Sequence, residues 1–373
     1  MTLPRILILY TGGTFGMEFR KKGAQGSIRT ESKTSESIHV SVPQLSPIDL
    51  KKRFLESVPE LQELAECEVD ILMNRDSAHI GPPEWISIAN TIQKQWKKYD
   101  GVVLLHGTDT LAYTASALSF LLRPCLKPVV MTGAQRPLAA LRNDARNNLI
   151  SAVEIAAYGP RKTVQQVSVV FGEDVFQGNR VRKKSASDYS AFESPYQLPL
   201  AIVGTTIRYT DSKMLSPKKW AKPALLPLFS NRVPMLHLTP GFSALLAQRS
   251  LLDTAEGLVL VAFPSGTAPT HDPTFLEFLR AAKRKFIPVV VVTEGSSQPP
   301  TAHTTLQARK FDYSAGRDLE KEGCFRAGLM TPECAYVKTA LILGQYNSPK
   351  SERLKRFKQL WDKNLAHEGI LTT

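Results

Sequence analysis

The sequence predicts an α/β protein: a larger N-terminal domain with a mostly parallel sheet flanked by helices, plus a smaller C-terminal α/β domain. The chain has 373 residues, which is more than a single domain usually contains. Short apolar runs recur along it, at Ile6–Tyr10, Val102–Leu105, Val129–Met131, Val167–Phe171, Leu258–Phe263 and Val289–Val292. Runs this short, without polar alternation, are typical of parallel strands that are covered on both faces.

Amphipathic stretches separate these runs and predict helices between the strands. They are Leu50–Glu66, Trp85–Tyr99, Thr110–Leu122, Leu141–Tyr158, Thr274–Phe286 and Pro332–Leu343. Strands that alternate with helices indicate right-handed βαβ units. We therefore expect a catalytic α/β domain over residues 1–200, a proline-rich linker over 201–232 and a second α/β domain over 233–373. The polar stretch 18–46 is expected to be a long loop that is either functional or disordered.

The composition excludes several classes of protein. Apolar residues make up 43% and charged residues 22%, which is ordinary for a globular protein. No apolar run approaches the ~18 residues that span a bilayer. The N-terminus leads into only five apolar residues, Ile6–Tyr10, too few for a signal peptide, so we expect a cytoplasmic protein without membrane attachment.

The charged and metal-binding residue types show no clustering. The formal net charge is +13, but the basic pairs are scattered along the chain, so we expect no nucleic-acid partner. The four cysteines form no C-x-x-C pair, and the seven histidines have no metal-ligand spacing. The sequence therefore predicts free structural thiols and no metal site.

A glycine-rich turn follows the first predicted strand. It reads Thr11-Gly-Gly-Thr14-Phe-Gly16 and departs from the G-x-G-x-x-G spacing of dinucleotide-binding loops. Ligands of α/β sheets bind at the carboxyl ends of the strands. A hydroxyl at this edge, beside backbone N–H donors, is typical of a nucleophile with an oxyanion site. A plain strand-to-loop turn is the structural alternative.

Two further motifs supply candidate catalytic groups. The run Val102–Leu105 ends in His106-Gly-Thr108-Asp109-Thr110, so a hydroxyl and a carboxylate follow a strand at the same sheet edge. Asp109 is also well placed to cap the next helix. Lys127 precedes the run Val129–Met131, with only Pro128 between them, and a lysine that is withdrawn from water can act as a general base.

Taken together, these motifs resemble the L-asparaginase family. The same family is indicated by Leu141–Leu149, by Gly178–Arg180 with Lys183, Phe192, Ser194 and Pro195, by Pro240–Ser243, and by Met330, Thr331, Glu333 and Lys338. The resemblance covers most of residues 5–345 and is strongest to the cytoplasmic type I branch. It implies hydrolysis of L-asparagine to L-aspartate and ammonia through a threonine acyl-enzyme. It also implies no cofactor, and a homo-oligomer, either a tetramer or a dimer.

The resemblance also assigns catalytic roles. Thr14 matches the threonine that is acylated. Thr108, Asp109 and Lys127 are matched to the second threonine's proton-transferring triad.

Substrate binding is assigned in the same way. Asp76 and Ser77 match the segment that binds the substrate's α-carboxylate, and Gly107, Thr108 and Asp109 complete the substrate-binding set. The Asp109 carboxylate is expected to pair with the α-ammonium group.

The chain departs from the family pattern at several positions. Ala78 and His79 replace a polar residue and an acid, and Thr267 replaces an asparagine. Gly23–Ser27 stands where many members have a tyrosine, and Gly295 replaces an effector-pocket cysteine. These changes predict weak asparagine affinity and leave the Asn/Gln preference and allostery open.

Two other functions are weighed against asparaginase. One is the asparaginase-like subunit of a tRNA-dependent amidotransferase, which usually has an additional N-terminal domain, whereas the TGGT motif here begins at Thr11. The other is a degenerate binding protein, which predicts that at least one of Thr14, Thr108, Asp109 and Lys127 is lost; all four are present.

Overall fold

The structure is a computed structural model of the chain. It describes residues 2–16, 18–19, 40–41, 52, 54–210, 226–242, 250–293, 314–345 and 348–368. Most of the expected loop 18–46 lies outside these ranges, as do Gly23–Ser27 and Gly295; within it, only the short antiparallel strands β2 (Glu18–Phe19) and β3 (Val40–Ser41) are described. No helix in the described ranges has the length and apolarity needed to cross a membrane. All four cysteines are described and are free thiols.

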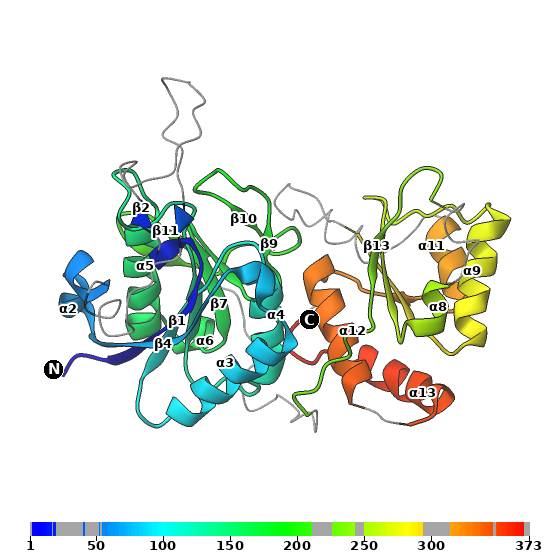
Figure 1. Ribbon diagram of the computed structural model, residues 1–373, viewed down its shortest axis with the longest axis horizontal. Helices are drawn as coiled ribbons and strands as arrows, with labels where there is room; N and C mark the ends of the chain where they lie inside the picture. Colours follow the sequence, from blue (N-terminus) through cyan, green and yellow to red (C-terminus); the bar gives the residue numbers. More distant parts are fainter. Residues whose placement is uncertain are drawn as a thin grey trace, which may run out of the picture.

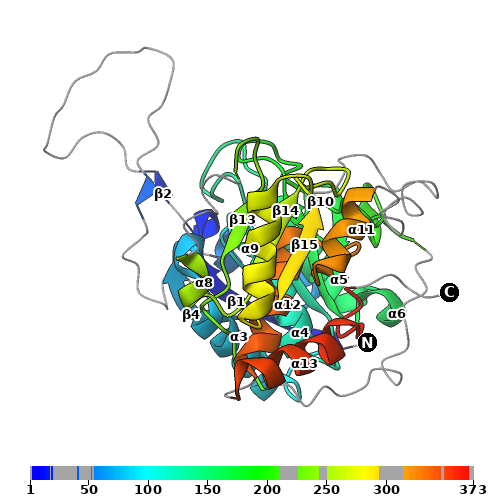
Figure 2. The same ribbon diagram turned by 90° about the vertical axis from the view of Figure 1, so that its right-hand side faces the viewer.

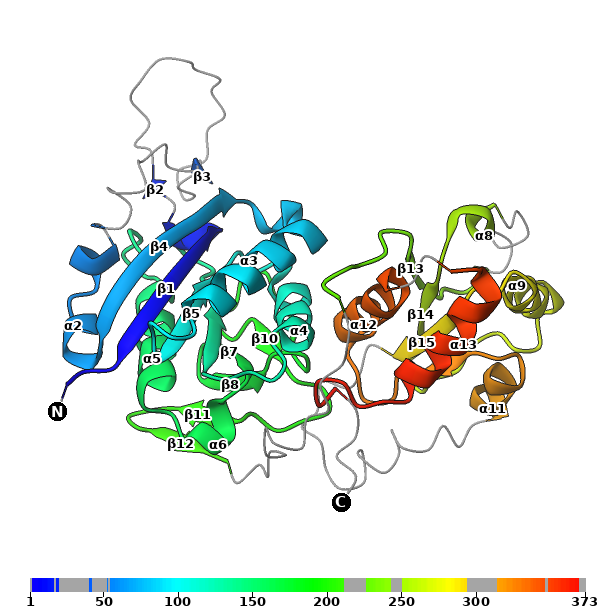
Figure 3. The same cartoon turned by 90° about the horizontal axis from the view of Figure 1, so that it is seen from below.

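The N-terminal domain is built on an eight-stranded sheet with the order β12-β11-β8-β7-β6-β5-β1-β4 (Figures 1 and 3). Its strands are β1 (Arg5–Gly12), β4 (Glu66–Arg75), β5 (Gly101–Leu105), β6 (Val129–Thr132), β7 (Val167–Phe171), β8 (Asp174–Gln177), β11 (Ala201–Val203) and β12 (Ile207–Tyr209). Strands β4, β1, β5, β6 and β7 are parallel to one another. Strands β8, β11 and β12 follow at the other side of the sheet, and each is antiparallel to its neighbours. The sheet is mostly parallel, as predicted.

The buried side chains of β1 explain why its sequence does not alternate. Ile6, Ile8 and Tyr10 face one hydrophobic cluster, whereas Leu7 and Leu9 face the cluster on the other side of the sheet. Successive side chains of a strand point to opposite faces, so a strand with helices on both sides must be apolar at every position.

Helices cover both faces of this sheet (Figure 3). One face carries α2 (Leu61–Leu64) and α5 (Ala145–Tyr158), and the other carries α3 (Pro82–Gln95) and α4 (Leu111–Leu121). The short helices η1 (Thr14–Gly16), η2 (Ser77–His79) and α6 (Arg161–Val164) and the two-stranded ribbon of β9 (Arg182–Lys183) and β10 (Phe192–Glu193) complete the domain.

Two expectations about this domain differ from the structure. The linker expected over residues 201–232 begins later, because β11, β12 and the turn between them occupy 201–209 and extend the N-terminal sheet. The helix predicted over Leu50–Glu66 is interrupted at Pro59, since residues 54–57 are helical and α2 begins only at Leu61. Proline has no N–H to continue a helix and disfavours helical backbone in the residue before it.

The C-terminal domain is a smaller α/β unit. Its parallel sheet has the order β13-β14-β15-β16, formed by Met235–His237, Leu258–Ala262, Val289–Thr293 and Phe325–Arg326. Helix α9 (Pro273–Arg284) covers its outer face together with α8 (Leu251–Thr254) and α11 (Ser314–Lys321) (Figure 2). Helices α12 (Pro332–Gly344) and α13 (Lys350–Trp361) cover the inner face.

The two domains lie side by side, with α4 of the first against α12 of the second (Figure 1). Their apolar contact is one continuous cluster, in which Trp85 and Phe120 join Val337 and Leu341. T-shaped stacking of Tyr113 on Tyr336, with ring centroids 5.8 Å apart, adds to it. Apolar burial therefore fixes the position of the second domain relative to the first.

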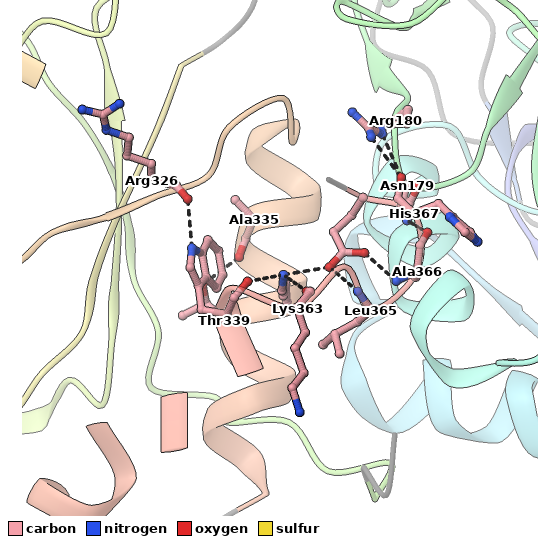
Figure 4. Close-up of polar contacts among 12 residues, drawn as sticks. Asn179, Arg180, Arg326, Ala335, Thr339, Lys363, Leu365, Ala366 and His367 are labelled. Atoms are coloured by element: carbon pink, nitrogen blue, oxygen red, sulfur yellow. Dashed lines mark hydrogen bonds and ion pairs between the residues drawn. The ribbon is translucent and has the colours of Figure 1, made fainter. Parts of the chain in front are cut away.

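After α13, residues 362–368 return to the N-terminal domain and form a segment that we call the C-terminal strap (Figure 4). Asn179 donates to the carbonyl oxygen of Ala366 at 2.6 Å, and Arg180 donates from Nη2 to that of His367 at 2.9 Å. Glu368, fully buried, pairs with Lys338 of α12 at 2.7 Å. The strap thus contacts both domains.

Removing the charge of Glu368 is expected to destabilise the protein strongly. The change Glu368→Gln leaves the Lys338 ammonium buried without its carboxylate, which typically costs about 3–5 kcal/mol. The exposed pair Arg356–Glu352 supplies a matched control, because both side chains are about half exposed, at 46% and 47%. We expect Glu352→Gln to cost only about 0–1 kcal/mol. Urea unfolding measures both free energies, and equal losses would contradict the prediction.

Candidate active site

The turn after β1 carries Thr14. Gly12 and Gly13 have φ angles of +122° and +84°, which side chains other than glycine rarely adopt. A Cβ atom on Gly12 would lie 2.0 Å from the carbonyl oxygen of Arg75, and one on Gly13 would lie 2.4 Å from the Cα atom of Gly107. The two glycines thus let the chain turn tightly between β4 and β5. Thr14, half-buried, begins the short helix η1 directly after this turn.

The loop after β5 occupies the centre of the site. Gly107 lies against Gly13 on one side and against Ser77 on the other, where an added Cβ would come within 2.7 Å of the serine Oγ. Thr110 ties the same two loops together by donating its hydroxyl to the carbonyl of Ser77 at 2.7 Å. The structure therefore brings Thr14, Ser77 and Thr108 to one edge of the sheet, through backbones in close contact.

Lys183 is the lysine of this group. Its Nζ atom donates to Oγ1 of Thr108 at 2.7 Å and to Oδ1 of Asp109 at 2.7 Å. The Lys183 side chain is only 17% exposed, whereas that of Asp109 is 68% exposed. Ion pairs with an exposed partner contribute little to stability. The pair's main effect is therefore to hold one ammonium group beside the Thr108 hydroxyl.

Lys127, the lysine expected from the sequence, is placed elsewhere. Its Nζ atom donates to the carbonyl of Tyr99, and Tyr99 lies just before β5, as Lys127 lies just before β6. These two parallel strands start at the same edge of the sheet and end, at Leu105 and Thr132, at the other. The expected grouping of Lys127 with Thr108 and Asp109 is therefore wrong. Lys127 lies at the edge of the sheet where the parallel strands begin, whereas Thr108 and Asp109 lie at the edge where they end.

Asp109 and Asp76 differ in what their carboxylates do. The N-cap position of α4 is Thr110, whose side chain makes no capping hydrogen bond, and Asp109 accepts a hydrogen bond from Lys183. Asp76 caps the short helix η2 by accepting from the backbone N–H of Ala78 at 2.8 Å. Asp76 is exposed and Ser77 is buried, so Ser77 is the more enclosed of the two expected substrate contacts.

His106 is a buried polar residue of this loop to which the sequence reasoning gave no role. It is 1% exposed and lies between the carbonyl of Gly107, 2.7 Å from Nδ1, and the hydroxyl of Thr114, 3.0 Å from Nε2. Burial lowers the pKa of His106 from 6.5 to about 4, although the hydrogen bond to Gly107 opposes the shift. The imidazole is therefore neutral at neutral pH.

This depressed pKa predicts a loss of stability in acid. The unfolded chain takes up a proton at His106 near pH 6.5, but the folded chain does so only near pH 4. The contribution is complete above about pH 6.5 and is lost as the pH falls toward 4, by roughly 3 kcal/mol in all. We expect urea unfolding to show a fall of about 2 kcal/mol more in the native protein than in His106→Asn between about pH 7 and pH 5. The same pH slope in both proteins would contradict this.

Among the described residues, no group of three or more His, Cys, Asp or Glu side chains is arranged to hold a metal ion. What the site presents is two threonine hydroxyls, one ammonium group, one exposed carboxylate and tightly turned backbone. That set is suited to nucleophilic attack on a carbonyl group with proton transfer by side chains.

Comparison with known proteins agrees with this geometry. Residues 5–215 match the family "Asparaginase, N-terminal", and residues 232–354 match "Glutaminase/Asparaginase C-terminal domain". L-asparaginase 1 of Escherichia coli is 32% identical over 345 residues, covering 92% of this chain and 93% of that protein. The solved structure of L-asparaginase I from Vibrio cholerae superposes with a TM-score of 0.77 at 31% identity, covering 99% of this chain and 100% of that one.

A relative with a different name is equally similar. The 60 kDa lysophospholipase of mouse is 33% identical over 382 residues, which is 98% of this chain but 63% of that protein. The chain thus spans less than two thirds of this longer relative.

Proposed function

The chain belongs to the asparaginase family, and from this premise we propose that it hydrolyses L-asparagine to L-aspartate and ammonia. The observation that carries the proposal is the Lys183 ammonium shared between Thr108 and Asp109, in the loop whose Gly107 touches the turn before Thr14. In the proposed reaction no cofactor or metal takes part.

The reaction proceeds in two steps. The hydroxyl oxygen of Thr14 attacks the side-chain amide carbon of asparagine, and its proton passes to the leaving nitrogen, so that ammonia departs and an ester forms. Water then attacks the ester, returns a proton to the Thr14 oxygen and releases aspartate. Thr108, Asp109 and Lys183 hold and transfer the protons in both steps. Backbone N–H groups of the glycine turn are suited to stabilise the oxyanion.

Substrate binding uses the two loops on either side of Gly107. Ser77 is buried, and its Oγ atom lies 2.7 Å from where a Cβ atom on Gly107 would stand. Its hydroxyl is suited to hold the α-carboxylate of the substrate. The exposed Asp109 carboxylate is suited to the α-ammonium group. We extend the proposal to a homo-oligomer, a dimer or tetramer, and to a cytoplasmic location, as in type I asparaginases.

An ammonia-release assay on the purified protein tests the proposal. We expect ammonia from L-asparagine, and less from L-glutamine. The assay should include a lysophospholipid, because relatives include a protein of that activity by name. Fatty acid release without ammonia release would overturn the proposal. Activity that requires an added partner subunit would instead favour the amidotransferase alternative.

A further inference from the structure

A chain of three hydrogen bonds leads from α3 to the backbone of the active-site loop. Nε1 of Trp85 lies 3.0 Å from the Thr114 hydroxyl, which lies 3.0 Å from Nε2 of His106. The other ring nitrogen of His106, Nδ1, lies 2.7 Å from the carbonyl oxygen of Gly107. His106 and Thr114 are fully or almost fully buried, and Trp85 is 3% exposed.

The two end groups, the Trp85 indole and the Gly107 carbonyl, determine the direction of every hydrogen bond in this series. The indole N–H of Trp85 can only donate, so the Thr114 oxygen accepts. The Gly107 carbonyl can only accept, so Nδ1 of His106 carries the proton. A neutral imidazole then has a bare Nε2, and Thr114 donates its own proton to it. Only one tautomer of His106 satisfies all four groups.

Gly107 is the residue on which the active-site loops converge. Its backbone touches Gly13, one residue before Thr14, and it touches Ser77 on the other side. Thr108 follows it directly and receives the hydrogen bond from Lys183. A rotation of the peptide group between Gly107 and Thr108 would therefore change the positions of Thr108 and Asp109 together.

We propose that His106 is a positioning residue of the active site, which holds the Gly107 carbonyl in one orientation through an Nδ1–H bond, while Thr114, bonded in turn by Trp85, holds the other side of the ring. His106 is buried behind the loop, and it acts on the reaction only through the backbone of Gly107. The inference rests on the proposed function and adds to it a residue that the site itself does not expose. Misplacement of a reacting group by even 1 Å can cost about 10²-fold in rate, so such a support has a measurable effect.

A substitution of His106 can separate the effect of the hydrogen bond to the Gly107 carbonyl from the effect of filling the space of the ring. The amide nitrogen of asparagine stands at the same distance from Cβ as Nδ1 of histidine, so His106→Asn retains a donor for the Gly107 carbonyl. The variant His106→Leu fills the space but has no donor. We expect His106→Leu to lower kcat by about tenfold or more, with KM changed less than about threefold, and His106→Asn to retain most of kcat.

A second pair of variants tests the hydrogen bond between Thr114 and Nε2 of His106. Thr114→Val removes the proton that Nε2 accepts and should lower kcat several-fold, whereas Thr114→Ser restores the hydroxyl and should restore kcat. Thr339→Val is the matched control, because Thr339 is also a fully buried helical threonine, with its hydroxyl bonded to Ala335 of its own helix at 2.7 Å. We expect Thr339→Val to leave kcat unchanged. Equal losses in His106→Leu and His106→Asn, or no rescue by serine at residue 114, would overturn the proposal.

A measurement that does not depend on turnover separates this inference from the proposed function. Imidazole ¹⁵N chemical shifts of histidine-labelled protein, assigned with His106→Asn, report which ring nitrogen is protonated. The inference requires a neutral ring protonated at Nδ1 in the native protein, and in Thr114→Val a shift of the Nε2 signal that reports the lost hydrogen bond. A ring protonated at Nε2 would overturn it even in an active asparaginase. Absence of ammonia release with the Nδ1 tautomer present would overturn the proposed function alone.

Discussion

The variant Thr14→Val should lose about 10³-fold or more in kcat for asparagine while it folds as the native protein does. Valine keeps the β-branched shape but lacks the oxygen that forms the ester, so covalent catalysis is lost. Thr14 is half-buried at the start of η1, and its position is fixed by the glycine turn before it. Ammonia release measures the rate, and a thermal melt followed by circular dichroism checks the fold.

The same substitution three residues earlier is the control for this experiment. Thr11 is fully buried, and its hydroxyl donates to the carbonyl of Leu105 at 2.9 Å, within the sheet. We expect Thr11→Val to cost about 1 kcal/mol of stability for the lost hydrogen bond, with turnover within a few-fold of native. Retention of near-native turnover by Thr14→Val would remove Thr14 from the mechanism.

The second large effect is expected at Lys183. The change Lys183→Met removes the ammonium group that contacts both Thr108 and Asp109. We expect a loss of about 10²–10⁴-fold in kcat, the usual range for a group that transfers protons. Lys183→Arg should not restore the rate, because a guanidinium group does not release its proton at working pH.

Lys127→Met is the matched control, because it removes a second half-buried lysine of the same domain. Lys127 donates to the carbonyl of Tyr99 at the opposite edge of the sheet. We expect Lys127→Met to change stability but to leave kcat within a few-fold of native. The reverse result, with Lys127→Met inactive and Lys183→Met active, would restore the assignment made from the sequence and contradict the one made from the structure.

The regular part of the fold could be predicted from the sequence. Each of the six apolar runs lies within a strand or extends one residue beyond it, because a sheet covered on both faces requires apolar residues at every position. The ten-residue strand β4 has no clear signal in the sequence, because it is largely half-exposed and begins at Glu66, the last residue of the helix expected over Leu50–Glu66. Strands β11 and β12 have three residues each, and strands this short, near several prolines, carry no periodicity.

The site was predicted in part, and the error has a physical cause. Thr14, Ser77, Thr108 and Asp109 follow parallel strands, and the rule that such loops meet at one edge places them correctly together. The same rule excludes Lys127, which precedes its strand. Lys183 lies in the two-residue strand β9, 75 residues after Thr108, and only the tertiary fold brings the two side chains together. Its sole signal in the sequence was its place in the family pattern after Gly178–Arg180.

The C-terminal strap has a consequence for how the protein matures during translation. Asn179 bonds to Ala366 and Arg180 to His367, and each pair is separated by 187 residues along the chain. At about 5–20 residues per second, the ribosome needs roughly 10 to 40 seconds to make that stretch. The N-terminal domain can form its sheet in this interval, but the segment that leads to Lys183 cannot make these bonds until residues 366 and 367 have emerged. The N-terminal domain therefore completes its contacts to the strap only after the C-terminal domain has been synthesised.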